Sequence, residues 1–331
     1  MKLKLRLSSC ILFVLILFGC TPNIFVVQEN DLMEEELGAY VFGPIVESGN
    51  YNEILQFKYY GEQIRIPYFV QGWGYGIVSE FGWFLFVDGV LQPTRLETAD
   101  GQIFREEAYM HEFGLAFEEI IEFDVVFTPV SGDLGEQVGL IGATLLRPGF
   151  MVEGVERPYF QIFHSLSATL PAELSINSNI LNDFSVYSDI SLTDIPTDIF
   201  DELMYMSGVA EKDTLLEILE HQLMIDLLGN REHEFIIYAS DGLINFELQI
   251  FGGQEVTSRI TFFVNHEPVS INGADFVEIT MEQGKMAIIP IEIEIDSLND
   301  LNSIYAIAMT TGDDYQLQDI FKARTLLLVN E

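Results

Sequence analysis

The chain has 331 residues, and 52 acidic against 15 basic side chains give it a formal charge of −37. A body with this charge repels phosphates and anionic lipid headgroups, so we exclude nucleic acid as a partner. The 26 Phe and 13 Tyr residues can build a large apolar core, and the length suits two ordinary domains. Because the carboxylates are spread along the chain, we favour a solvated acidic surface over one site for a polycation.

Residues 1–20 read MKLKLRLSSCILFVLILFGC and have the three parts of a secretory signal peptide. Three cations come first, an apolar run from Leu7 to Phe18 follows, and Gly19 and Cys20 end the segment. The apolar run is shorter than the roughly 20 residues that a membrane-spanning helix requires. The segment therefore predicts export, with a body that is tethered to the membrane and not embedded in it.

The tetrapeptide Leu17-Phe18-Gly19-Cys20 resembles the lipobox of bacterial lipoproteins, with Phe18 in place of the usual small residue. The resemblance covers residues 1–20 alone. It implies that signal peptidase II cuts before Cys20 and that this cysteine carries a covalent diacylglyceryl lipid. The alternative is an ordinary signal peptide with an accidental cysteine. Because Cys10 would leave with the signal peptide, no disulfide or free thiol is expected in the mature chain.

We expect a signal peptide over residues 1–19 and a tether with a brief helix (Asp31–Tyr40) over residues 20–52. A first domain follows over residues 53–165, with strands predicted by short aromatic and β-branched runs between turn residues. Within it, Phe123, Val125 and Phe127 fall on one face of Glu122–Thr128, which is typical of a half-buried strand. The predicted strands are Ile54–Tyr60, Ile64–Val70, Trp83–Val87, Phe113–Phe117, Glu122–Thr128, Val138–Leu146 and Tyr159–Phe163.

Residues 166–230 are read as a connector rich in Ser, Asn, Asp and Thr. Its leucines predict one amphipathic helix over Glu211–Leu228, capped by Gly229. We read the leucine stripe as packing and not as partner recognition.

Residues 231–331 form the predicted second domain, in which Ile291–Ile295 alternates apolar and acidic residues. The predicted strands are Phe235–Ala239, Ile244–Ile250, Arg259–Val264, Phe276–Thr280, Met286–Ile295, Ile304–Met309 and Thr325–Val329.

The predicted fold class is mainly β, with two tandem Ig-like β-sandwich domains bridged by the connector and its helix. Matches in the same order indicate an internal repeat: residues 84–88 resemble 262–265, residues 122–128 resemble 291–295, and residues 161–164 resemble 319–322. The alternative is one large irregular β domain.

Chemistry-bearing motifs are weak in this sequence. No two of the five histidines are spaced to share one helix face, and no serine elbow or phosphate loop occurs. The glycine-rich segment QGWGYG is read as a tight connection, and the alternative is a ligand-contact loop in which Trp73 and Tyr75 stack on a sugar or a partner. An oxygen-rich loop offers weak candidate ligands for Ca²⁺, namely Asp296, Asn299, Asp300 and Asn302. We favour a solvated turn there and expect no metal or other cofactor.

These features predict a cell-membrane lipoprotein facing the extracytoplasmic side, with a non-catalytic binding or assembly role at the envelope. The expected partners are the lipid bilayer, through Cys20, and another envelope protein or wall polysaccharide. One alternative is an envelope polysaccharide hydrolase with paired carboxylates, although the 52 acidic residues make chance pairs inevitable. Another is a passive structural spacer.

Overall fold

The computed structural model describes residues 38–45, 55–74, 79–116, 118–150, 164–168, 172–181, 183–207, 209–219, 223–229, 236–252, 257–311 and 320–330. The first half contains β1 (Gly38–Pro44), β2 (Gln56–Tyr59), β3 (Ile64–Gly74), β4 (Ser79–Val87), β5 (Val90–Gln92), β6 (Thr94–Glu97), β7 (Ile103–Ala108), β8 (Met110–Leu115), β9 (Ile120–Phe127), β10 (Gln137–Leu146), β11 (Leu166–Ala168) and β12 (Ala172–Ile176).

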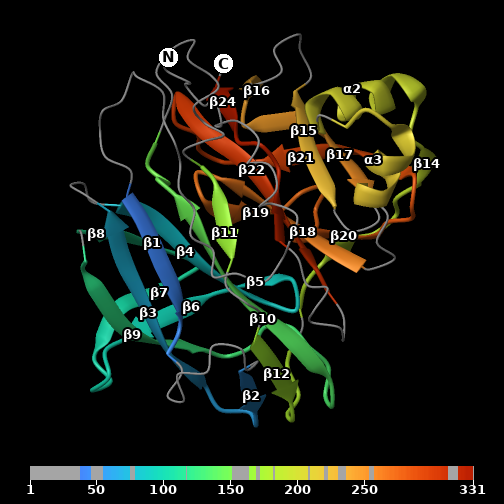
Figure 1. Ribbon diagram of the computed structural model, residues 1–331. Coiled ribbons are helices and arrows are strands. Elements are labelled where there is room, and N and C mark those ends of the chain that lie inside the picture. Colours follow the sequence, from blue (N-terminus) through green and yellow to red (C-terminus); the bar gives the residue numbers. More distant parts are fainter. Residues whose placement is uncertain are drawn as a thin grey trace, which may run out of the picture.

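The remaining elements lie in the connector and the second half (Figure 1). The connector holds β13 (Val186–Tyr187), β14 (Thr193–Asp194), α2 (Thr197–Ser207) and α3 (Lys212–Leu219). The second half contains β15 (Met224–Gly229), β16 (Ile236–Ser240), β17 (Leu243–Gly252), β18 (Thr257–Val264), β19 (Glu267–Val269), β20 (Phe276–Thr280), β21 (Lys285–Glu294), β22 (Leu301–Thr310), β23 (Ile320–Lys322) and β24 (Leu326–Asn330).

In the first half, two sheets face each other across an apolar core. One has the strand order β1-β3-β9-β6-β7, and the other has the order β2-β12-β10-β4-β5 with β8 and β11 at its sides. Strand β9 illustrates how the sequence places side chains in this core. Its residues Phe123, Val125 and Phe127 are buried, as their alternation predicts. They pack with Trp83 and Leu174 from the opposite sheet. This is a β-sandwich.

In the second half, the strands of one long sheet contribute to a single apolar core. The strand order is β20-β18-β22-β24-β16-β17-β21, and the buried residues Ile291 and Ile293 alternate with exposed Glu292 and Glu294. The predicted mainly β fold class is therefore confirmed, and the first half has the two facing sheets of a sandwich.

Both halves repeat the same pattern of strand pairing. In each, a long strand (β3 or β17) lies between β1 or β15 on one side and β9 or β21 on the other. Two-residue hairpins join β4 to β5 and β18 to β19, and the first strand of each pairs with β10 or β22. Finally, β12 and β24 pair in parallel with β2 and β16. The strand topology thus supports the predicted internal repeat.

One of the sequence matches changes register. Residues 166–168 and residues 320–322 hold corresponding places, because they pair with corresponding parts of β10 and β22. The match of residues 161–164 to residues 319–322 was therefore wrong by a few positions. Strands of similar composition do not fix their own register.

The two halves pack through corresponding faces of their sheets. The pairing of β4 with β10 and of β18 with β22 makes Phe86 correspond to Phe263, Ile141 to Tyr305 and Leu145 to Met309. All six side chains are buried in one cluster that joins the halves. A Phe84–Phe263 ring contact, 5.6 Å between centroids, crosses this interface. The halves are thus arranged like the subunits of an isologous dimer.

The predicted helix over Glu211–Leu228 is wrong in its second part. Helix α3 ends at Leu219, and residues 224–229 form β15, which pairs antiparallel with β17. Ile225 and Leu227 are buried while Asp226 between them binds Arg324, so the period there is two and not 3.6. Gly229 is the last residue of this strand and not a helix cap.

The connector is also shorter than residues 166–230 and holds two helices instead of one. Strands β11 and β12 pair with β10 in the first half, and β15 belongs to the second. Near the start, residues 38–40 of the helix expected over Asp31–Tyr40 belong to β1, and its remainder lies outside the described residues. Neither described helix, α2 or α3, is long and apolar enough to cross a membrane.

Candidate binding edge

The sequence-predicted lipidation site, Cys20, lies outside the described residues, as does Tyr75. Trp73 lies in β3, where its backbone pairs with Ala39 of β1. The predicted loop over Gln71–Gly76 is therefore strand as far as Gly74. Gly72 is required in this strand, because a Cβ there would lie 2.5 Å from the carbonyl oxygen of Ala116. The glycine permits close packing and gives no sign of a mobile loop.

Asn302, one of the weak candidate ligands for Ca²⁺, is engaged in hydrogen bonds within the protein. The Asn302 side chain is fully buried, and its Oδ1 accepts hydrogen bonds from Asn265 Nδ2 (2.8 Å) and from the Asn299 backbone N–H (3.0 Å). Its Nδ2 donates to the Asn299 carbonyl oxygen at 2.8 Å. Both lone pairs of Oδ1 are thus engaged in fixing the turn before β22. Among the described residues, no group of three His, Cys, Asp or Glu side chains is placed to hold a metal ion.

A hairpin distinguishes the first half from the second. Between β5 and β8 the chain runs through residues 93–109, whereas residues 270–275 make the corresponding link between β19 and β20. The longer link forms β6 and β7, which extend the sheet beyond β9. Sequence analysis missed both strands. The Arg95-Leu96-Glu97 alternation was a short signal for β6, and the polar sequence of β7 gave none.

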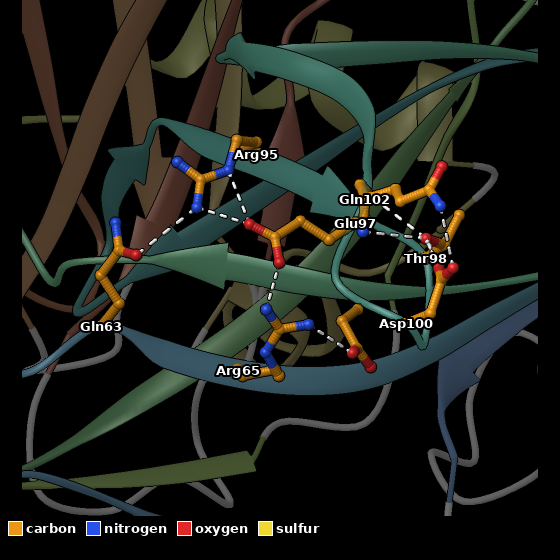
Figure 2. A network of polar contacts seen from close by, with 8 residues as sticks. Gln63, Arg65, Arg95, Glu97, Thr98, Asp100 and Gln102 are labelled. Carbon is orange, nitrogen blue, oxygen red and sulfur yellow. Dashed lines mark hydrogen bonds and ion pairs between the residues drawn. The ribbon is translucent and has the colours of Figure 1, made fainter.

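Ion pairs hold this hairpin onto the sheet (Figure 2). The Glu97 carboxylate, whose side chain is 6% exposed, accepts hydrogen bonds from Arg95 on its own strand and from Arg65 on β3. Arg65 also binds Asp124 of β9 at 2.6 Å, so the contacts span β3, β9 and β6. The hydrogen bond from Arg95, followed by that from Arg65, lowers the pKa of Glu97. Arg95 reaches Gln63 as well, at 3.5 Å.

A second set of hydrogen bonds fixes the turn of the hairpin (Figure 2). The Gln102 backbone N–H donates to Thr98 Oγ1 at 3.1 Å, and Gln102 Nε2 donates to Asp100 Oδ2 at 3.0 Å. The hydroxyl of Thr98 also donates to Asp100, and this bond lowers the pKa of the Asp100 carboxyl. Gly101, at φ +81°, supplies the left-handed position of the turn. The hairpin is therefore held at its base and at its tip.

Strand β7 is the outermost strand of its sheet, and among the described residues it pairs with β6 alone. All residues from Ile103 to Glu107 are exposed, including two large apolar side chains, Ile103 at 55% and Phe104 at 38%. The guanidinium of Arg105 lies 5.3 Å from the Phe104 ring and 5.7 Å from the Phe113 ring. These features make β7 a fixed, partly apolar sheet edge, which we name the β7 edge (residues 103–107).

A buried polar cluster lies between the halves and is the second concentration of titratable groups. His266 Nε2 donates to the Pro148 carbonyl oxygen at 2.6 Å, so Nδ1 accepts from the Tyr305 hydroxyl at 3.1 Å. Burial lowers the pKa of His266 and lowers that of His164 to about 3. His266 lies in the β18–β19 turn, at φ +70°. Both rings are neutral near pH 7. His266 links the halves by its hydrogen bond to Pro148, and the His164 ring lies against the His266 ring, with 5.6 Å between centroids.

No family model and no curated protein matches this chain. Among solved structures, fibronectin(III)-like modules of Clostridium thermocellum CbhA match at 10% identity and a TM-score of 0.21, over 84% of this chain and 89% of that chain. The C-terminal domain of the Streptococcus agalactiae AgI/II polypeptide BspA matches at 7% identity and a TM-score of 0.23, over 88% and 99%. The YadV chaperone matches at 8% and 0.21, over 86% and 98%. At these scores, the fold description rests on this chain's own strand pairing.

Proposed function

We propose that this protein is a lipid-anchored envelope protein with a non-catalytic binding or assembly role, and that the β7 edge is its contact surface. The Cys20 lipid would hold it on the extracytoplasmic side of the cell membrane. The observation that carries the binding role is the hairpin itself. Ion pairs and turn hydrogen bonds fix it, yet it keeps Ile103 and Phe104 exposed at a sheet edge.

This arrangement favours binding over a passive spacer. A spacer needs two rigidly joined domains, and the buried interface between the halves would be sufficient for that. It does not need an inserted hairpin whose base and tip are separately fixed. Exposed apolar side chains on such an element are typical of a contact surface, because they are otherwise an aggregation liability. The expected partners remain an envelope protein or wall polysaccharide.

The test is retention of an envelope component. The mature chain, carrying Cys20→Ser to keep it soluble, is immobilised and exposed separately to isolated cell wall and to detergent-solubilised membranes. Saturable retention of one membrane protein or of wall polysaccharide supports the binding role. Retention of neither favours a spacer, and release of soluble sugars from the wall would favour the hydrolase. Lipid attachment is tested separately, by incorporation of labelled palmitate that the Cys20→Ser variant loses.

A further inference from the structure

The two halves differ in what lies beyond the corresponding strands β9 and β21. In the second half, β14 pairs with β21 on the side where β6 pairs with β9 in the first. Helices α2 and α3 cover that region, since Leu215 and Leu219 pack with Phe251 and Met286. In the first half, the sheet instead extends to β7 and stops. Among the described residues, no element covers the β7 edge.

An uncovered outer strand has backbone N–H and C=O groups free to pair with another extended chain. Bulges and charged side chains normally limit such pairing, and β7 has both. Its register with β6 shifts twice, and Arg105, Glu106 and Glu107 are exposed. These features select among partners, because an added strand must supply side chains complementary to this charge pattern.

Charge determines which kind of strand fits. Glu106 and Glu107 lie on the edge itself, with Asp100 in the preceding turn and Glu112 exposed on β8, while Arg105 is stacked on aromatic rings. The most direct alternative occupant, a second copy of this chain, would bring together two bodies that each carry a charge of −37. Repulsion between them disfavours that pairing. An incoming strand with cations beside these carboxylates is attracted instead.

We propose that the β7 edge receives an extended segment of a partner protein as an added β-strand. Its Lys or Arg side chains would lie against Glu106 and Glu107, and its apolar side chains against Ile103 and Phe104. This rests on the proposed binding function and names the partner's chemistry. Main-chain hydrogen bonds would hold the segment, and the alternation of cationic and apolar side chains would select it.

The probe is a short labelled peptide of alternating lysine and valine, titrated into the mature Cys20→Ser chain and followed by fluorescence anisotropy. One companion peptide is N-methylated at every backbone nitrogen, which keeps its side-chain charge and removes its backbone donors. Another replaces lysine by glutamate. Glu106→Lys/Glu107→Lys is the test variant. Glu292→Lys/Glu294→Lys is the matched control, since it makes the same charge change on exposed residues of β21.

We expect saturable binding of one lysine-valine peptide per chain. The affinity should fall at least tenfold for the β7 variant, for the N-methylated peptide and for Ile103→Thr, an exposed site where folding is not at risk. The β21 control should bind like the wild type. Equal weakening by both charge variants, or unimpaired binding of the N-methylated peptide, would mean general attraction to an acidic body and would overturn strand addition.

The envelope retention experiment separates this proposal from the proposed function. If the wild-type chain retains an envelope component and the Glu106→Lys/Glu107→Lys chain retains it equally well, the binding role stands and the β7 edge is not its site. If the wild type retains nothing, the binding role itself fails. Hydrogen exchange on the peptide complex gives an independent readout, because an added strand slows exchange of amides within residues 103–107.

Discussion

Replacing Lys322 by Met should change how the stability of the protein depends on pH. The Lys322 ammonium is buried between the halves, where Nζ donates to Thr325 Oγ1 (2.7 Å) and to the Ala323 carbonyl oxygen (3.1 Å). It lies 4.9 Å from the centroid of the Tyr305 ring. No carboxylate makes an ion pair with it among the described residues. Burial therefore lowers the pKa of Lys322 from 10.5 to about 7.

The direction in which stability changes with pH follows from the number of protons bound in the folded and unfolded states. Between pH 7 and 10.5 the unfolded chain holds a proton on Lys322 that the folded chain releases, so stability rises with pH across this window. Each pKa unit corresponds to about 1.4 kcal/mol, so the full shift is worth roughly 5 kcal/mol. Because titration in the folded state is gradual near pH 7, we expect a gain of about 2 kcal/mol between pH 7 and 9. His164 and His266 add a separate loss of stability below pH 6.5, since their pKa values are also lowered from 6.5.

The assay is urea unfolding of the mature Cys20→Ser chain at pH 7, 8 and 9, with and without Lys322→Met. The wild type should become more stable as pH rises, and the variant should lose most of that slope. Lys58→Met, at an exposed position on β2, is the control and should keep the wild-type slope. A wild-type stability that is flat between pH 7 and 9, or a slope that survives in Lys322→Met, would refute the reasoning.

Three further outcomes test the packing and the site. Gly72→Ala should destabilise the first half by about 1–3 kcal/mol in thermal or urea unfolding, because its Cβ would meet the Ala116 carbonyl oxygen; Gly149→Ala, which meets no neighbouring atom, should be neutral. Asp88→Ala should cost about 3 kcal/mol in urea unfolding, since the half-buried Arg259 that joins the halves then loses one of its two carboxylates, and a cost near zero would contradict this. Glu97→Gln should speed hydrogen exchange in β6 and β7 while leaving β10 unchanged, and equal exchange in all three strands would show that the ion pairs do not hold the hairpin.

Sequence patterns located the strands well where one face is buried and the other solvated. Residues 122–125 and 291–295 alternate acidic and apolar side chains, and the structure buries Phe123, Val125, Ile291 and Ile293. The same reasoning failed over residues 224–228, because Met-Ile-Asp-Leu-Leu fits a helix and a strand equally well when read alone. Pairing with β17 and the contact of Asp226 with Arg324 decide between them, and both partners are distant in sequence.

The candidate site was harder to find because its residues carry no apolar pattern. Strand β7 is polar in all but Ile103, Phe104 and Ala108, and its position follows from a β6 strand fixed by Arg65 of β3. The small number of basic residues gives one clue to which strands are neighbours. Most of the described basic side chains are engaged in contacts within the protein, so an Arg in a strand indicates a carboxylate or an aromatic ring nearby. Such an argument needs the register, which the sequence does not supply.

The repeat directs attention to what the halves do not share. Their common topology and common interface face serve packing, since corresponding residues such as Phe86 and Phe263 meet in one buried cluster. Surfaces specific to one half are therefore the places where a distinct role can arise. The second half receives α2 and α3, which cover Phe251 and Met286. The first half receives a hairpin that buries Leu96 in the core, leaves residues 103–107 exposed and is held by ion pairs. Of the two additions, the hairpin is therefore the one on which we place the proposed contact with another molecule.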